Sequence, residues 1–187
     1  MAQLKLIILD FDGTLVDTRR ANACAYIETL REAGITITEK EYLEKYYGVR
    51  CIEFMRMVGI NDESKIRGLR QRKVELYPNY FDSVKLNTEL WAWCGMMRKM
   101  GAKVWIVSTG HIDNIRNVMH HLNITSGIDG IISGDDVSQS KPSPEPFFEA
   151  MRREGCTADE TIIFEDSKVG VEAARRTGAQ YVVIKMD

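Results

Sequence analysis

The chain has little of several residue types that would narrow its class at once. Its 187 residues include only four cysteines, three histidines and four prolines. The cysteines form no C-x-x-C pair, and no histidine stands at zinc-ligand spacing, which favours plain thiols in a reducing compartment over a zinc or disulfide site. No apolar run approaches the roughly 20 residues of a membrane helix. We therefore expect a cytoplasmic protein that makes no membrane contact. The cysteines are Cys24, Cys51, Cys94 and Cys156.

An excess of charge of one sign is also missing. The 25 basic and 27 acidic residues give a formal net charge of −2 at pH 7, so the chain as a whole is not drawn to nucleic acid or anionic lipid. The one basic cluster lies in a helical pattern with acidic residues around it, and we interpret it as a solvated helix face. We expect no nucleic-acid partner. The cluster comprises Lys65, Arg67, Arg70, Arg72 and Lys73.

Five short apolar runs predict the strands of a parallel sheet. Most are continuous rather than alternating, which is typical of strands buried on both faces. Helical patterns separate the later runs, so we expect a doubly wound α/β sheet that binds its ligand at the carboxyl ends of the strands. The predicted strands are Leu4–Asp10, Ala102–Ser108, Gly130–Ser133, Thr161–Glu165 and Gln180–Ile184, and the predicted helices are Thr88–Met100, Ile112–Leu122, Pro144–Glu154 and Lys168–Thr177.

A helical insertion interrupts this alternation after the first strand. Residues 17–81 contain several helical patterns and no convincing strand. We therefore expect two domains: an α/β core of residues 1–16 and 82–187, and a small α-helical cap of residues 17–81 over the end of the first strand. The helical patterns in the cap are Ala21–Ala33, Glu39–Tyr47, Cys51–Val58 and Asp62–Tyr77.

Two carboxylates leave the end of the first predicted strand together. Asp10 and Asp12 belong to the sequence D-x-D-G-T, which follows the apolar run directly. Residues two apart on an extended chain point to the same face, so one carboxylate can attack while the other handles a proton. This motif alone is a moderate signal, because acidic turns after strands are common.

Three further elements fall at or after later strand ends. They are Ser108-Thr109-Gly110, Lys141-Pro142, and Glu165-Asp166 with the Ser-Lys that follows. Phosphoryl transfer to a carboxylate needs such parts: a hydroxyl and backbone N–H groups for the phosphoryl oxygens, a lysine beside the nucleophile, and further acids for Mg²⁺. Positioning and electrostatics carry most of that reaction.

Together these motifs resemble the haloacid dehalogenase (HAD) superfamily. The K-P-x-P-E-P-F of Lys141–Phe147 and the F-E-D-S-x-x-G of Phe164–Gly170 are the most specific parts, and all four motifs occur in order along the chain. The resemblance is to members with a small helical cap, the phosphoglycolate phosphatase and β-phosphoglucomutase types. It implies a Mg²⁺-dependent phosphatase with a Rossmann-like core.

By position, the resemblance implies a role for each motif residue. Asp10 would be the nucleophile that forms an aspartyl-phosphate, and Asp12 the general acid/base. Ser108, Thr109 and Lys141 would bind the phosphoryl group. Mg²⁺ would be held by Asp10, the backbone carbonyl of Asp12, and Asp166, with Glu165 at or near the ion.

Other residues keep two interpretations. Glu165 and Asp166 could simply cap the helix that begins near Ser167. Arg50, in a predicted cap loop, and His111 are candidate substrate ligands, although each could equally begin a helix. We interpret Asp135 and Asp136 as loop residues.

The activity also has alternatives. We expect hydrolysis of a small phosphorylated metabolite by a monomer or weak homodimer. A phosphomutase of the β-phosphoglucomutase type would use the same core, and inorganic pyrophosphate is an open substrate because a small cap can close over a small anion. A dehalogenase is disfavoured by comparison with that family, since dehalogenases lack the second acid that Asp12 supplies. A signalling receiver domain is disfavoured by the helical insertion.

Overall fold

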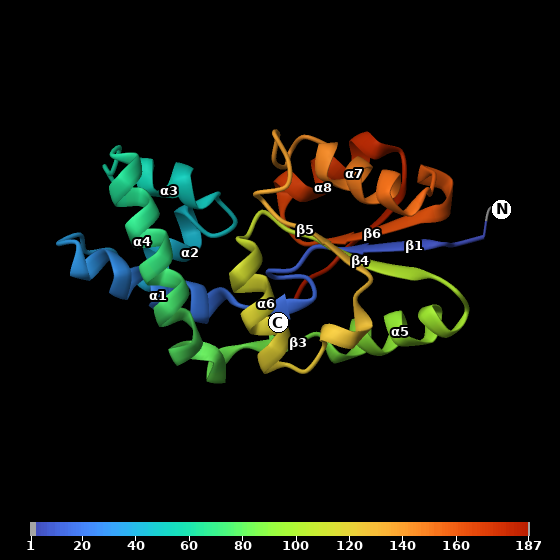
Figure 1. The fold of residues 1–187 in the computed structure, drawn as a ribbon, viewed down its shortest axis with the longest axis horizontal. Helices are drawn as coiled ribbons and strands as arrows, with labels where there is room; N and C mark the ends of the chain where they lie inside the picture. Colours follow the sequence, from blue (N-terminus) through green and yellow to red (C-terminus); the bar gives the residue numbers. More distant parts are fainter. Residues whose placement is uncertain (1–2, 187) are drawn as a thin grey trace.

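A five-stranded parallel sheet forms the centre of the computed structural model, which describes residues 3–186 (Figure 1). The strand order is β5-β4-β1-β6-β7, and every neighbouring pair is parallel. All five predicted strands are confirmed, with slightly shorter bounds for four of them. The strands are β1 (Leu6–Leu9), β4 (Lys103–Val107), β5 (Gly130–Ile132), β6 (Thr161–Glu165) and β7 (Gln180–Val183).

The register of the three central strands places their carboxyl ends at one level. Leu9 of β1 lies opposite Ile106 of β4 and Phe164 of β6. All four residues of β1 are fully buried, as expected for a strand covered on both faces. The residues that follow β1, β4 and β6 are therefore brought together at one edge of the sheet.

Helices cover both faces of the sheet. On one face, α5 (Thr88–Lys99) and α6 (Ile112–His121) pack against the side chains of Ile7 and Leu9. On the other, α7 (Glu145–Glu154) and α8 (Lys168–Thr177) pack against Leu6 and Ile8, and Figure 1 shows these two pairs on opposite sides. The doubly wound α/β fold predicted from the sequence is confirmed.

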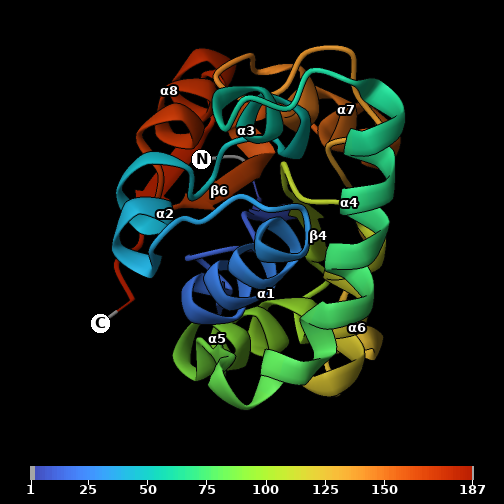
Figure 2. The ribbon, with the colours of Figure 1, turned by 90° about the vertical axis from the view of Figure 1, so that its left-hand side faces the viewer.

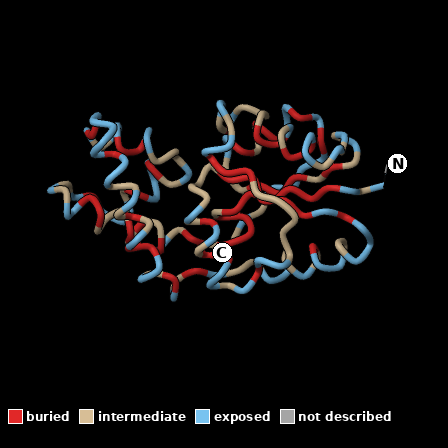
Figure 3. The backbone as a smooth tube through the Cα atoms, in the orientation of Figure 1, coloured by how far each residue is buried: buried red, intermediate tan, exposed pale blue. Residues whose placement is uncertain are grey.

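Four helices between β1 and α5 pack around a hydrophobic cluster of their own. They lie at the end of the molecule toward which β1 runs, as Figures 1 and 2 show. In Figure 3 the buried backbone concentrates in the central strands, and a second set of buried segments lies among these helices. Their division from the core as a domain of residues 17–81 remains a prediction. The helices are α1 (Arg19–Glu32), α2 (Glu39–Lys45), α3 (Cys51–Met57) and α4 (Glu63–Leu76).

Two short strands at the crossing between the two parts were not predicted. β2 (Val16–Asp17) pairs antiparallel with β3 (Lys85–Leu86), and the 3₁₀ helix η1 (Tyr77–Ser83) precedes β3. Two-residue strands are too short to leave a periodic pattern in the sequence. Within the described residues, no helix has the length and apolar character needed to cross a membrane.

Candidate active site

A buried lysine lies between two carboxylates at the carboxyl edge of the sheet. Nζ of Lys141 is 2.7 Å from Oδ1 of Asp10 and 2.5 Å from Oε1 of Glu165. It also donates a hydrogen bond to the carbonyl oxygen of Val107 at 2.9 Å. The side chain of Lys141 is 2% exposed and that of Glu165 is 0% exposed, so water screens these charges weakly. This geometry lets Lys141 neutralise negative charge beside Asp10.

Burial and repulsion between neighbouring carboxylates dominate the electrostatics of this cluster. Burial, and then the charge of Glu165, raise the pKa of Asp10 well above its ordinary value. Burial and Glu165 likewise raise the pKa of Asp166 to about 6. Burial alone would lower the pKa of Lys141, but the charges of Asp10 and Glu165 outweigh it and raise that pKa. The cluster therefore holds more negative charge than one lysine balances.

The same cluster fits a divalent cation. Asp10, Glu165 and Asp166 each offer one oxygen, and these oxygens lie within 4.8 Å of one another. Carboxylate oxygens are the ligands that Mg²⁺ prefers, and a divalent cation would offset the repulsion that raises the pKa values of Asp10 and Asp166.

Glu165 is already heavily engaged by the protein. Its Oε1 accepts from Lys141, while its Oε2 accepts from the backbone N–H groups of Asp166 and Ser167 at 3.0 and 3.1 Å and from the Ser167 hydroxyl at 3.1 Å. These bonds favour a role for Glu165 in fixing Lys141 and the start of α8. Direct ligation of a metal by Glu165 stays a prediction, and Asp10 and Asp166 are the acids better placed for it.

Two glycines are required by close approaches to these acids. Gly13 has a φ of +94°, and a Cβ there would lie 2.2 Å from Oδ2 of Asp166. At Gly170, in α8, a Cβ would lie 1.9 Å from Oε1 of Glu165. A side chain at either position would displace a carboxylate of the cluster. The glycines of the D-x-D-G-T and F-E-D-S-x-x-G motifs thus have a local physical reason.

Asp12 lies apart from the lysine and is held by neutral donors. Its Oδ1 accepts from the hydroxyl of Thr18 and from the side-chain amide of Asn22 at 3.1 Å. Asn22 in turn donates to the Thr18 hydroxyl at 2.9 Å and accepts from Nζ of Lys73 at 2.8 Å. The carboxylate of Asp12 is therefore oriented by a hydrogen-bonded chain that begins in α1 and ends in α4.

Every site residue predicted from the sequence except Glu165 lines one cavity of about 140 Å³. Ser108 directly follows β4, and its buried hydroxyl accepts from the backbone N–H of Gly110 at 3.0 Å. Thr109 is half-buried beside it. Glu165 is fully buried and is not among the residues that line the cavity. The cavity residues predicted from the sequence are Asp10, Asp12, Arg50, Ser108, Thr109, His111, Lys141 and Asp166.

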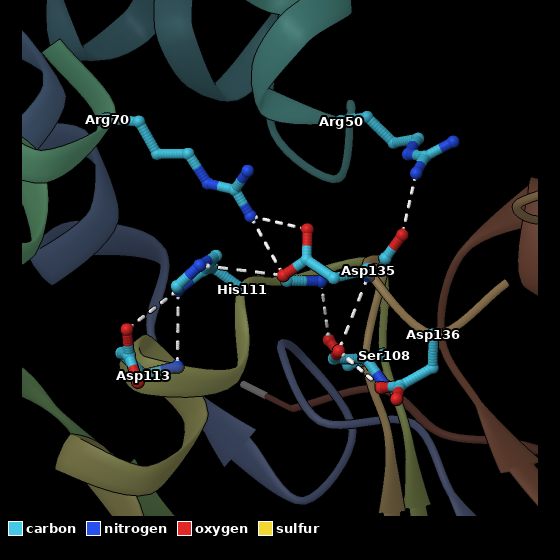
Figure 4. Close-up of polar contacts among 10 residues, drawn as sticks. Arg50, Arg70, Ser108, His111, Asp113, Asp135 and Asp136 are labelled. Atoms are coloured by element: carbon cyan, nitrogen blue, oxygen red, sulfur yellow. Dashed lines mark hydrogen bonds and ion pairs between the residues drawn. The ribbon is translucent and has the colours of Figure 1, made fainter. Parts of the chain in front are cut away.

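The segment that contains helices α1 to α4 contacts the α/β core at the loop after β5 (Figure 4). Arg50, just before α3, donates to the carbonyl oxygen of Gly134 at 2.6 Å. Arg70 of α4 donates to both carboxylate oxygens of Asp135, at 2.6 and 2.9 Å. His111 caps the start of α6, and its Nε2 lies 3.5 Å from Oδ2 of Asp135. Asp135 is thus a loop residue that also borders the cavity.

The interpretation of the basic cluster on α4 is wrong for Lys73. Lys73 is 2% exposed, lines the cavity, and lies 3.4 Å from the centre of the Tyr77 ring. Arg70 is half-buried and also lines the cavity, whereas Lys65 and Arg67 are exposed as expected. The sequence did contain an indication that Lys73 faces inward. It lies seven residues after Ile66 and three before Leu76, so the three share one helix face, and Ile66 and Leu76 are buried.

Replacing Lys73 with methionine is expected to stabilise the fold near neutral pH. Burial lowers the pKa of Lys73 to about 7, whereas its ordinary value is 10.5. Between these values the unfolded chain binds more protons than the native one, so the free energy of unfolding rises with pH. Lys73→Met should raise that free energy by about 1–4 kcal/mol at pH 6.5 and by little at pH 9.5.

Urea denaturation at the two pH values measures this effect. Lys65→Met is the matched control, because Lys65 is an exposed lysine on the same helix. An equal loss of stability at both pH values would mean that packing of the Lys73 stem on Tyr77 outweighs the burial of its charge.

The chain has many relatives of known sequence and structure. A sequence model of the family described as haloacid dehalogenase-like hydrolase matches residues 7–184. The 6-phosphogluconate phosphatase of Escherichia coli (strain K12) is 26% identical in an alignment of 186 residues that covers 96% of this chain and 82% of that protein. The phosphoglycolate phosphatase of Aquifex aeolicus (strain VF5) is 25% identical in an alignment of 182 residues that covers 95% of this chain and 83% of that protein.

Solved structures share the fold at lower sequence identity. CbbY from Rhodobacter sphaeroides in complex with phosphate has a TM-score of 0.89 at 21% identity and covers 99% of this chain and 88% of its own. A β-phosphoglucomutase from Clostridium difficile has a TM-score of 0.82 at 21% identity, covering 97% and 84%. These two likenesses concern the fold alone.

Proposed function

The chain belongs to the haloacid dehalogenase-like hydrolase family and is a phosphatase, and we propose that it hydrolyses a small phosphate ester through an aspartyl-phosphate on Asp10. The observation that carries the mechanism is the buried contact of 2.7 Å between Asp10 and Lys141 at the base of the cavity. A carboxylate in direct contact with a fixed cation, with Ser108 nearby, suits attack on an anionic phosphoryl group.

In the first step a carboxylate oxygen of Asp10 attacks phosphorus, and the bond from phosphorus to the ester oxygen breaks. Asp12 gives its proton to the departing oxygen, which leaves as an alcohol. The hydrogen bonds that Oδ1 of Asp12 accepts from Thr18 and Asn22 hold this carboxyl group in a fixed orientation for the transfer. Lys141 and the Ser108 hydroxyl balance the charge on the transferring phosphoryl oxygens.

In the second step Asp12, now a carboxylate, takes a proton from water. The oxygen of that water attacks phosphorus, the bond to Asp10 breaks, and inorganic phosphate leaves. A positioned acid/base of this kind contributes roughly 10²–10⁴ in rate. Asp10 and Asp166, with the backbone carbonyl of Asp12, would hold Mg²⁺, which supplies charge neutralisation at the phosphoryl group when bound.

The size of the cavity favours a small substrate. Its volume of about 140 Å³ is close to the ~150 Å³ of a protein cavity that holds benzene. Phosphoglycolate and 6-phosphogluconate, named in the relatives, are small phosphorylated acids. We propose a small phosphorylated metabolite as the substrate class.

Two alternatives use the same core. A pyrophosphatase is supported by the pyrophosphatase PpaX of Bacillus velezensis, 26% identical over 174 residues. A phosphomutase would return the phosphoryl group to the substrate instead of to water. A pyrophosphatase differs from a phosphoesterase in its substrate, and a phosphomutase differs in its product, so one assay separates all three.

Release of inorganic phosphate from a panel of small phosphate esters and pyrophosphate, with Mg²⁺ and with EDTA, tests the proposal. We expect release from esters that needs Mg²⁺. Release from pyrophosphate alone would favour the pyrophosphatase, and conversion of a sugar 1-phosphate to a 6-phosphate without free phosphate would favour the mutase. No turnover of any compound would contradict the catalytic proposal.

The cellular location and the oligomeric state of the protein are also proposals. Cys24, Cys51, Cys94 and Cys156 are all free thiols, which suits a reducing compartment. We keep the cytoplasm as the proposed location, a monomer or weak homodimer as the proposed state, and no nucleic-acid or membrane partner.

A further inference from the structure

Three buried polar atoms have no hydrogen-bond partner among the residues that the structure describes, and all three belong to residues that line the active-site cavity. They are the hydroxyl of Tyr47, Nε of Arg70 and Oδ1 of Asn114. A buried polar atom without a partner costs about 1–3 kcal/mol, so such atoms are rare in native proteins. Because all three residues line one cavity, a ligand in that cavity would supply the missing hydrogen-bond partners.

The three residues come from both sides of the cavity. Tyr47 lies in the loop between α2 and α3, Arg70 on α4, and Asn114 in the first turn of α6 in the core. None belongs to the four sequence motifs at the strand ends. Their side chains therefore line the cavity together with the strand-end motifs, in the space left for the part of the substrate beyond the phosphoryl group.

Asp135 determines which part of Arg70 is free. It binds one terminal nitrogen of the guanidinium with both carboxylate oxygens, at 2.6 and 2.9 Å (Figure 4). This contact holds the arginine side chain in place, and Nε has no hydrogen-bond partner within residues 3–186. Asp135 is thus a positioning residue for Arg70.

Each of the three atoms requires a particular kind of hydrogen-bond partner. Nε of Arg70 is a donor only and needs an oxygen acceptor. Oδ1 of Asn114 is an acceptor and needs a donor such as a hydroxyl. Tyr47 can do either, and burial raises its pKa, so its hydroxyl keeps a proton to donate.

We propose that Tyr47, Arg70 and Asn114 recognise the leaving group of the substrate, and that this leaving group is hydroxylated. It carries at least one hydroxyl that donates to Asn114 and oxygen atoms that accept from Arg70 and Tyr47. The inference rests on the proposed phosphatase function. A plain alkyl chain would leave all three atoms unpaired, and fully ionised pyrophosphate, which offers acceptors only, would leave Asn114 unpaired.

Alkyl phosphates of two to six carbons, each paired with the polyol phosphate of the same chain length, isolate this recognition. Within a pair, only the hydroxyl groups differ. We expect the wild-type protein to prefer the polyol phosphate in kcat/KM by about tenfold or more for at least one chain length, since each net hydrogen bond is worth about 2–10-fold. The gain should appear mainly as a lower KM, as for binding shared by ground and transition states.

Three conservative variants assign the preference to the residues. Tyr47→Phe removes only a hydroxyl, Arg70→Lys keeps the charge facing Asp135 but removes Nε, and Asn114→Leu keeps the shape. Each should reduce the ratio of polyol to alkyl kcat/KM about 3–10-fold. Arg72→Lys is the matched control, because Arg72 on the same helix pairs with Glu32 instead of the cavity, and it should leave the ratio unchanged.

The outcomes separate the inference from the function it rests on. Turnover of both ester classes without a preference in the wild type overturns the inference and keeps the phosphatase. A preference that survives all three variants also overturns it, and would mean that water alone satisfies the three atoms. Absence of turnover with every ester removes the phosphatase proposal and this inference with it. Thermal melts of the variants confirm that each is folded.

Discussion

Replacing Asp10 with asparagine is expected to lower phosphate release by roughly 10³-fold or more, because the amide cannot form the aspartyl-phosphate. The change is nearly isosteric, so the fold and the cavity should persist. Removing the charge also relieves repulsion from Glu165, which together with burial raises the pKa of Asp10. The variant should therefore be at least as stable as the wild type.

Steady-state phosphate release and rapid-quench trapping of a phosphorylated protein measure this effect. Wild type should show acid-stable label on the peptide that contains Asp10, and the variant none. Asp12→Asn should lose about 10²–10⁴ in rate, the contribution of a positioned acid/base. Asp159→Asn, an exposed acid before β6, is the control. Label at another residue in Asp10→Asn would rule out Asp10 as the nucleophile.

Replacing Lys141 with methionine is expected to remove activity and also to destabilise the fold by about 3–5 kcal/mol. Breaking a buried ion pair on one side leaves an uncompensated charge, and here two buried acids, Asp10 and Glu165, lose the same partner. Activity should fall because no cation then offsets the phosphoryl charge beside Asp10.

Urea denaturation in EDTA, with activity measured in Mg²⁺, separates the two consequences. Adding Glu165→Gln to Lys141→Met removes one of the two stranded charges. This double variant should recover part of the lost stability and none of the activity. Recovery of both would mean that Lys141 acts on the fold alone, and a single variant as stable as the wild type would contradict the proposed charge balance.

The sheet and the residues at its edge were predictable because both rest on local signals. Continuous apolar runs such as Leu6–Leu9 indicate strands that are buried on both faces, and parallel strands place their carboxyl ends at one edge. Asp10, Ser108 and Glu165 each end or follow such a strand, so their convergence follows from the topology. Helix bounds were accurate for a similar reason: Ser167 caps α8, and Gly178 ends it in a left-handed conformation.

Which residues of the inserted helices line the cavity was not predictable in the same way. Lys73 looked like a member of a solvated basic face, and only its packing against Tyr77 and Asn22 puts it inside the cavity. Glu165 was predicted to lie at or near the metal, which stays a prediction, and the sequence did not show that its oxygens also accept from Lys141 and the first backbone N–H groups after β6. The hydrogen bonds from Lys73 to Asn22 and from Lys141 to Glu165 join residues far apart in the sequence, and no short-range pattern encodes them.

The amino-acid sequence alone predicts which strands are buried, which carboxylates and hydroxyls end or follow them, and that a lysine lies in the loop after β5, and together these indicate the class of reaction. These properties depend on side-chain type and spacing along the chain, which are local. Which residues of the inserted helices face that edge follows instead from the three-dimensional packing, because helix packing selects one face of each helix. The unpaired atoms of Tyr47, Arg70 and Asn114, and with them the proposed selectivity for a hydroxylated leaving group, emerge from that packing alone.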